Sequence, residues 1–290
     1  MSIPSPHPRQ DSDGIVNALS VDVEDYFHVG AFESVIARDR WDSFESRVET
    51  NTHRLLELFS AADVKATMFV LGWVAERFPG LVRDMQSAGH ELAIHGYDHR
   101  RLTTLTVDEF KSDIRRSRAL VEDISGTEVV GYRAPNYSMV RNTLWASEIL
   151  LEEGFLYDSS IFPTFRGRTG IPNAPRHPWV IQQKDGRRLH EFPVSTVRIL
   201  GVNVPFVGGA YLRQLPLSYI EWGMRRVNRR ERLPAMVYVH PWEIDPEQPV
   251  QPVSMLTRIR HYRNLDETYG RLTRLFRDFQ FTTVRRVLGV

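Results

Sequence analysis

Short apolar segments alternate with longer amphipathic segments along most of this chain, and no other sequence feature restricts the fold as much. We expect β-strands at residues 15–23, 66–71, 92–95, 129–132, 155–157, 191–200, 235–239 and 281–284. Apolar residues at helical spacing predict helices at 46–61, 73–88, 107–125, 143–153, 215–228 and 265–279. Alternating strands and helices form a mainly parallel sheet with right-handed crossovers. The pattern predicts an α/β fold, and six or seven such units favour a closed or nearly closed barrel.

The overall composition excludes several functional classes. The chain of 290 residues contains no cysteine, so a bound metal must take histidine and carboxylate ligands. Its net charge of +1 provides no strong field toward nucleic acid, and we expect no nucleic-acid partner. No stretch of about 18 consecutive apolar residues is present, so we expect no integral membrane segment.

Local composition suggests three parts of the chain. Residues 1–14 are rich in proline, serine and aspartate and lack the apolar stretch of a signal peptide. We expect them to be a disordered N-terminal segment, and we expect a cytoplasmic protein. A proline-rich linker at 246–252 separates a barrel at 15–245 from a C-terminal extension at 246–290, which we expect to pack on the barrel.

Two of the ten histidines, His95 and His99, lie four residues apart, and no other pair has this spacing. Both follow the apolar segment 92–94. If a helical turn begins at His95, the two imidazoles share one face and supply two of the three protein ligands of a catalytic metal site. For this segment taken alone, two solvated histidines in a turn are the simpler interpretation.

Titratable residues also end the other predicted strands. Each has an ordinary structural explanation when it is taken singly, such as a helix cap, a surface ion pair or a satisfied core histidine. In a parallel barrel, however, the carboxyl ends of the strands meet on one rim, where active sites lie. The strand ends therefore predict one site that contains Asp22, Glu24, His95, Arg133, Asp158 and His240.

The acidic residues at the end of the first predicted strand suggest a metal centre and a catalytic base. Alternation along a strand places Asp22 and Glu24 on one face and directs Asp25 elsewhere. Glu24 with His95 and His99 would hold a divalent ion such as zinc and leave one position open for water. Asp22, beside that ligand, could accept the proton of the water.

The remaining residues fit the other roles of amide hydrolysis. Arg133 could pair with Asp22 and keep it ionised. His240, on a distant strand, could protonate the leaving amine, and Asp158 could orient its imidazole. Backbone N–H groups after Pro135 could help to stabilise the oxyanion.

At these residues the chain resembles the polysaccharide deacetylases of carbohydrate esterase family 4, or NodB-homology family, and in particular a branch associated with bacterial exopolysaccharide and exosortase (PEP-CTERM) loci. The resemblance covers roughly residues 15–290 and rests on SVDVEDYFHV, KATMFVLGWVAERFP, GHELAIHGYDH, GYRAPNYS, YDSSIFP and VYVHPWEIDPEQP. It implies a distorted (β/α) barrel of seven strands and metal-dependent removal of N-acetyl groups from amino sugars. By the same resemblance, the catalytic base is Asp22, the metal ligands include His95 and His99, the catalytic acid is His240, and Arg133 and Asp158 match conserved motif positions.

Three positions depart from the pattern of this family. Val23 follows Asp22 where the family usually has a second aspartate, so we assign the third metal ligand to Glu24, with Asp25 as the alternative. The position after Pro135 is usually aromatic, and here it is Asn136, with Tyr137 next. In the motif that supplies the catalytic acid, Pro241 follows His240 where the family has an acidic residue. These departures concern substrate placement more than reaction type.

The expected substrate is an N-acetylated polysaccharide or oligosaccharide, from an exopolysaccharide or its lipid-linked precursor. We expect Pro135, Asn136, Tyr137 and Trp242 to contact it, the aromatic residues by stacking on sugar rings or, equally, by packing the barrel mouth. Two alternatives remain open. One is a hydrolase of small amides that resembles allantoinase-like relatives, and the other is a non-catalytic glycan-binding protein.

Overall fold

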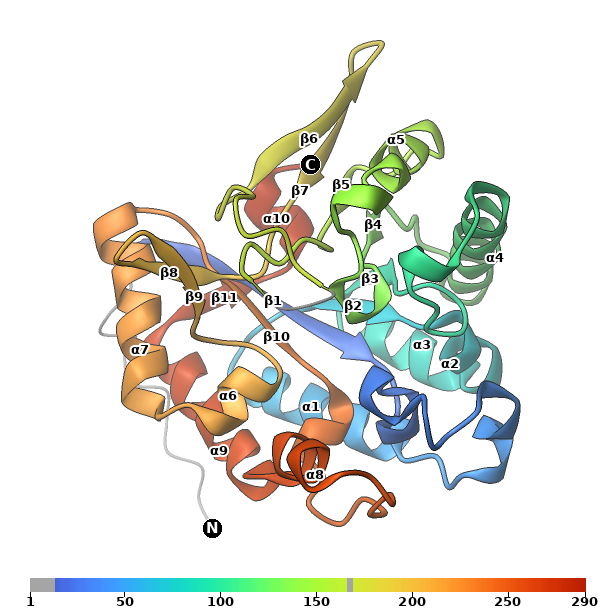
Figure 1. Ribbon diagram of the computed structural model, residues 1–290, viewed down its shortest axis with the longest axis horizontal. Coiled ribbons are helices and arrows are strands. Elements are labelled where there is room, and N and C mark those ends of the chain that lie inside the picture. Colours follow the sequence, from blue (N-terminus) through green and yellow to red (C-terminus); the bar gives the residue numbers. More distant parts are fainter. Residues whose placement is uncertain (1–13, 166–168) are drawn as a thin grey trace.

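The computed structural model describes residues 14–165 and 169–290. Its centre is a nine-stranded sheet in the order β10-β1-β2-β3-β4-β5-β7-β6, with β11 paired to β1 (Figure 1). The strands are β1 (Val16–Val23), β2 (Thr67–Val70), β3 (Glu91–Ile94), β4 (Gly131–Tyr132), β5 (Tyr157–Asp158), β6 (Trp179–Lys184), β7 (Arg187–Glu191), β10 (Met236–Val239) and β11 (Gln280–Thr282). A separate hairpin joins β8 (Thr196–Ile199) to β9 (Val202–Pro205).

The predicted α/β fold is confirmed: seven strands follow one another in parallel pairs, and β11 adds a further strand parallel to β1. Neighbours from β10 through β1, β2, β3, β4 and β5 to β7 pair in parallel, and only β6 runs antiparallel to its neighbour β7. Among the described residues, no strand pairing joins β7 to β10. Instead, the N–H of Phe192 donates to the carbonyl of Asp158, and Ser195 Oγ accepts from the N–H of Met236. The segment 192–195 therefore spans the gap, and the barrel is distorted there.

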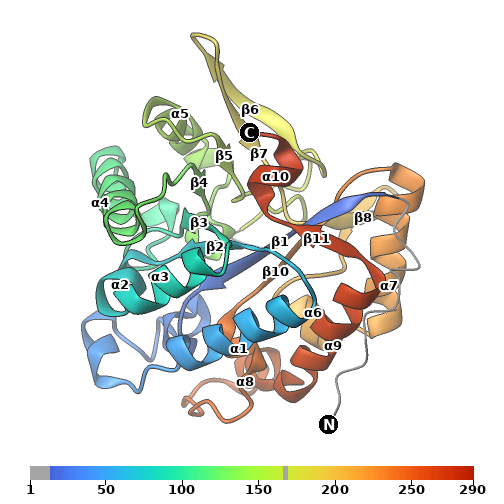
Figure 2. The same cartoon turned by 180° about the vertical axis from the view of Figure 1, so that it is seen from behind.

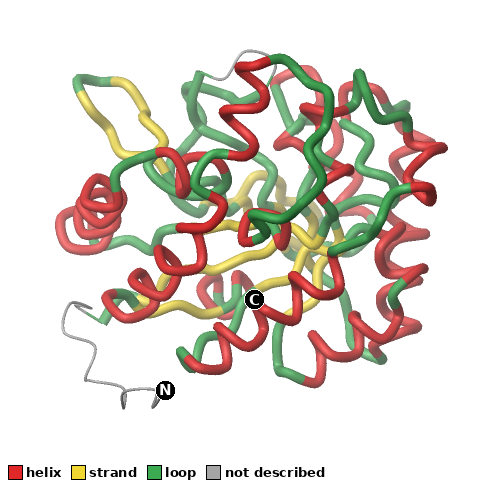
Figure 3. Tube along the Cα trace, turned by 90° about the horizontal axis from the view of Figure 1, so that it is seen from below, coloured by secondary structure: helices red, strands yellow, loops and turns green. Residues whose placement is uncertain are grey.

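Helices cover the outside of the sheet, as Figures 1 and 2 show. Figure 3 shows most of the strands gathered in the interior with helices around them, and the hairpin of β6 and β7 projects at the periphery (Figure 1). The helices are α1 (Val48–Ala61), α2 (Gly72–Arg77), α3 (Pro79–Ser87), α4 (Val107–Ser125), α5 (Trp145–Glu152), α6 (Ala210–Gln214), α7 (Leu217–Arg225), α8 (Met255–Tyr262), α9 (Leu265–Asp278) and α10 (Val284–Leu288). None of the helices in the described ranges is long and apolar enough to span a bilayer.

Local sequence signals explain most element boundaries. Helix α4 begins with a capping box between Thr106 and Glu109 and ends at Gly126 in the left-handed conformation. The single helix predicted at 73–88 is wrong, because Pro79 lacks an N–H group and separates α2 from α3. The strand predicted at 191–200 is likewise divided, since residues 192–195 leave β7 to bridge the gap before β8 begins.

The central strand β1 is buried along nearly its whole length, as expected for a parallel sheet that is covered on both faces. The C-terminal part of the chain packs on this strand: Val16 of β1 is in register with Gln280 of β11. The boundary predicted between a barrel at 15–245 and an extension at 246–290 stays a prediction. Of the predicted disordered segment 1–14, residues 1–13 lie outside the described residues.

Candidate metal centre and active site

The carboxyl ends of the parallel strands surround a pocket of about 380 Å³. Eight of the residues singled out in the sequence line it, namely Asp22, Glu24, His95, His99, Asn136, Tyr137, His240 and Trp242. Arg133, Pro135 and Asp158 are also buried near these strand ends but do not line the pocket. The structure therefore brings residues from distant parts of the chain to one place.

Three residues that line this pocket could hold a metal ion. Glu24, His95 and His99 each offer one ligand atom, and these atoms all lie within 4.8 Å of one another. His99 Nε2 is 2.9 Å from Glu24 Oε2, and all three side chains are buried. Two imidazoles and a carboxylate are a donor set that suits zinc.

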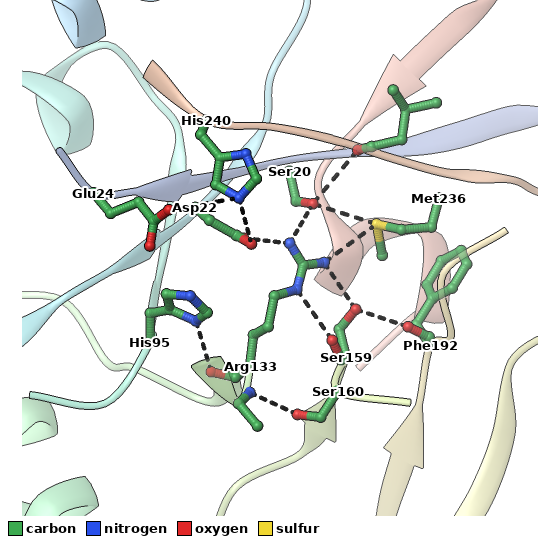
Figure 4. Close-up of polar contacts among 12 residues, drawn as sticks. Ser20, Asp22, Glu24, His95, Arg133, Ser159, Ser160, Phe192, Met236 and His240 are labelled. Atoms are coloured by element: carbon green, nitrogen blue, oxygen red, sulfur yellow. Dashed lines mark hydrogen bonds and ion pairs between the residues drawn. The ribbon is translucent and has the colours of Figure 1, made fainter. Parts of the chain in front are cut away.

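The surroundings of these residues fit a metal ion. His95 Nδ1 is 2.8 Å from the carbonyl oxygen of Arg133, which leaves Nε2 free as a ligand (Figure 4). Burial lowers the pKa of His95 to about 4, so its imidazole is neutral near pH 7. Burial alone would raise the pKa of Glu24, but the neighbouring His99 and His240 outweigh it and lower the pKa, so Glu24 is a carboxylate.

The two histidines do not share a helical turn, so the local structure considered in the sequence analysis is wrong although the imidazoles do meet. His95 follows β3, and the next residues form a loop in which Gly96 and His99 have φ angles of 72° and 57°. The N–H of Tyr97 donates to the carboxylate of Asp113 on α4, which fixes the loop. The ring centroids of His95 and His99 are 5.4 Å apart.

Asp25, the alternative third ligand, is engaged elsewhere. Its Oδ2 accepts hydrogen bonds from the Ser46 hydroxyl and from the N–H groups of Arg47 and Val48, at 2.7, 2.7 and 3.0 Å. These amides lie at the start of α1, so Asp25 anchors that helix terminus. The carboxylate that lies beside the two imidazoles belongs to Glu24.

Asp22 lies beside the ligand set and is held by a buried arginine (Figure 4). Arg133 Nη1 donates to Asp22 Oδ1 at 2.5 Å and to Ser20 Oγ at 2.9 Å. Ser159 accepts two further hydrogen bonds from the same guanidinium group. The predicted pairing of Arg133 with Asp22 is therefore present.

His240 faces this carboxylate from β10. Its Nε2 is 3.7 Å from both Asp22 Oδ2 and Glu24 Oε1. The prediction that Asp158 orients this imidazole is wrong, because His240 Nδ1 lies 2.9 Å from Glu243 Oε2. Asp158 instead accepts from the Ser160 hydroxyl and shares a hydrogen bond with buried Glu191. Asp158 thus belongs to a separate buried carboxyl pair.

Sequence reasoning missed Glu243 and its partner Arg213. The two form a buried ion pair at 2.7 Å, with side-chain exposures of 0% and 1%. Burial alone would raise the pKa of Glu243, but Arg213 and His240 lower it to about 2. The spacing of Glu243 and His240 could have indicated their contact, because Glu243 follows His240 by three residues. Both lie at the short helix Pro241–Ile244. For Arg213, no sequence motif gave a signal.

Glu243→Gln should lower the pKa of His240. Burial alone would lower this pKa, but the Glu243 carboxylate, with smaller contributions from Glu24 and Asp22, raises it to about 9. Removal of the nearest negative charge favours the neutral imidazole, so the titration must move to lower pH. NMR titration of the His240 ring in metal-free protein measures this shift directly. An unchanged titration would contradict the assigned partner.

The residues predicted to contact the substrate do not all occupy the same part of the site. Asn136, with φ of 57°, and Tyr137 form part of the pocket wall. Trp242 is only 5% exposed, and its Nε1 donates to Glu24 Oε1 at 3.2 Å. The indole also stacks between the rings of His240 and His261, with centroid distances of 5.0 and 4.3 Å. Trp242 therefore supports the ligand set and the imidazole from behind.

Two protein-family models match separate segments of the chain. Residues 39–150 match the polysaccharide deacetylase family, and residues 159–289 match a domain of unknown function, DUF3473. Both histidines of the candidate ligand set lie in the first matched region, whereas His240, Glu243 and Arg213 lie in the second. The domain of unknown function therefore completes the pocket.

Curated relatives resemble only part of this chain. A peptidoglycan deacetylase of Helicobacter pylori is 34% identical over 113 residues, which are 39% of this chain and 38% of the relative. A peptidoglycan-N-acetylglucosamine deacetylase of Bacillus cereus is 32% identical over 98 residues, 33% of this chain and 36% of the relative. The chain thus spans little more than a third of these relatives.

Solved structures show the same fold over nearly the whole chain. The structure of a putative polysaccharide deacetylase from Mycobacterium smegmatis superposes with a TM-score of 0.60 at 20% identity. The matched region covers 99% of this chain and 93% of the M. smegmatis chain. The Puue allantoinase has a TM-score of 0.61 at 16% identity, with coverage of 99% and 92%. At these identities the likeness concerns the fold.

Proposed function

We propose that this protein is a metal-dependent N-deacetylase of amino sugars in a glycan, with a zinc ion held by Glu24, His95 and His99. The observation that carries the proposal is the position of Asp22 and His240 beside the buried ligand set, each on its own strand. Amide hydrolysis needs a proton acceptor for the attacking water and a proton donor for the leaving amine, and these two side chains suit those roles.

When bound, the divalent ion polarises the amide carbonyl and lowers the pKa of a coordinated water to about 7. Asp22 accepts the proton of the attacking water, and the hydrogen bond from Arg133 orients its carboxylate. His240, with a pKa raised to about 9, is protonated near neutral pH and delivers a proton to the amine nitrogen. Glu243 fixes the imidazole through Nδ1 and so directs Nε2 toward the pocket.

For the substrate, we propose N-acetylated sugar residues of a bacterial exopolysaccharide or its lipid-linked precursor. The name of the Bacillus cereus relative, a peptidoglycan-N-acetylglucosamine deacetylase, supports an N-acetylglucosamine-type sugar. The sequence resemblance described above favours an exopolysaccharide over peptidoglycan. The expected cytoplasmic location stays a prediction, which fractionation of cells would test.

Acetate release from a panel of N-acetylhexosamine polymers and lipid-linked oligosaccharides tests this function. We expect release from at least one polymer, loss of release on chelation, and recovery when zinc is added. Elemental analysis should find about one divalent ion per chain. Hydrolysis of allantoin with no acetate release across the panel would favour the small-amide alternative. Glycan binding without hydrolysis by the metal-loaded protein would favour the non-catalytic one.

A further inference from the structure

The apolar side chains of helix α8 face outward from the protein. A surface helix normally turns its apolar side chains to the core. In α8, Met255 and Leu256 are each 76% exposed and Ile259 is 43% exposed. At about 100° per residue these three side chains form one continuous stripe on the outward face. Figure 1 shows α8 at the periphery of the molecule, beside α6 and α9.

Polar contacts hold the inward face of α8 to the active-site pocket. His261 is buried, stacks on Trp242 and lies 2.6 Å from Gln248 Oε1 through its Nε2. Arg213 donates to the carbonyls of His261 and Arg260 at 2.6 and 3.2 Å, near the end of the helix. Thr257 lines the pocket together with His261. The apolar stripe is therefore fixed outward by contacts on the opposite side.

Arginines flank the apolar stripe. By helical geometry, Arg258 lies on one side of it and Arg260 on the other, and Arg263 follows the end of the helix. All three side chains are exposed, and within the described ranges none of them forms an ion pair. The segment 250–264 contains no acidic residue. This arrangement, apolar in the middle and cationic at both edges, is that of a helix that lies in a membrane interface.

We propose that α8 docks the protein on the surface of an anionic lipid bilayer. Met255, Leu256 and Ile259 would enter the boundary between headgroups and acyl chains, while the three arginines contact lipid phosphates. Because Thr257 and His261 of the same helix line the pocket, docking would hold the pocket entrance close to the membrane. The proposal concerns binding and does not depend on the proposed deacetylation.

Co-sedimentation of the full chain with vesicles tests this proposal. We expect binding to vesicles of phosphatidylcholine with phosphatidylglycerol, and weaker binding to phosphatidylcholine alone or at high salt. The double substitution Met255→Ser with Leu256→Ser should weaken binding by about tenfold or more. Arg258→Gln and Arg263→Gln should each weaken it by about fivefold. Because these side chains are exposed, the thermal unfolding of the variants should match that of the unmodified protein.

Two matched controls assign the effect to α8. Leu200 is 99% exposed at the turn between β8 and β9, and Arg277 is 60% exposed on α9. Leu200→Ser and Arg277→Gln should leave vesicle binding unchanged. Absence of binding to anionic vesicles, or an equal loss in the Leu200→Ser variant, would overturn the proposal. So would a dimer in solution that the Met255/Leu256 double substitution dissociates, because the apolar stripe would then cover a second copy of the chain.

Discussion

Asp22→Asn should reduce acetate release by about 10²- to 10⁴-fold while the bound divalent metal remains. Asparagine keeps the size and one oxygen of the side chain but cannot accept a proton at neutral pH. Asp22 is not part of the ligand group of Glu24, His95 and His99, so metal affinity should change little. Acetate release at saturating substrate, together with elemental analysis of the same sample, measures both quantities.

Glu24→Gln is the matched control for this experiment, since it neutralises the neighbouring carboxylate two residues away. Glu24 Oε2 lies 2.9 Å from His99 Nε2 within the ligand group, so this variant should lose metal and activity together. Circular dichroism should show that both variants are folded. Unchanged turnover in Asp22→Asn would remove Asp22 from the proposed mechanism, and loss of metal from this variant would make it a ligand.

The main features of the fold and site could be predicted because they depend on local patterns and one general rule. Apolar segments of four to nine residues matched strands such as β1, β2 and β10 to within one or two residues. The rule that parallel strands place their carboxyl ends on one rim then predicted that Asp22, His95 and His240 would meet. The structure places these three around one pocket, although they are far apart in the sequence.

The contacts within the site could not be predicted in the same way. Two carboxyl groups, Asp158 and Glu243, were each close enough to a strand end to reach His240. The choice depends on the short helix that begins at Pro241, which turns the chain so that Glu243 folds back on the imidazole. The loop at His99 depends on Asp113 of α4, which no pattern near the histidines reveals.

Arg213 shows a further limit of sequence reasoning. It lies on α6, a helix of five residues that is too short to give a periodic signal. Its role arises entirely from tertiary contacts, since it joins Glu243 to the carbonyl groups of His261 and Arg263. The residue that connects Glu243 and the His240 imidazole to the C-terminal helices is therefore visible only in the folded structure.

Arg213→Met should destabilise the protein by about 3–5 kcal/mol. Methionine keeps much of the apolar volume but removes the positive charge, so the buried carboxylate of Glu243 loses its strongest partner and is left with the His240 imidazole. The carbonyls of Arg260 and His261 also lose their donor. Urea unfolding followed by circular dichroism measures the change in the free energy of unfolding.

Two further variants test whether the buried charge causes this loss. Arg277→Met removes an arginine whose side chain is 60% exposed and paired with Asp278, and it should change stability by less than about 1 kcal/mol. In the double variant Arg213→Met with Glu243→Gln, the buried carboxylate is also removed, so part of the stability should return. Two results would contradict this interpretation: a loss of less than about 1 kcal/mol in Arg213→Met alone, or a double variant as unstable as the sum of the single variants. In either case the pair does not act as a buried electrostatic unit. Arg213 would then stabilise the fold only through the carbonyl groups that it contacts.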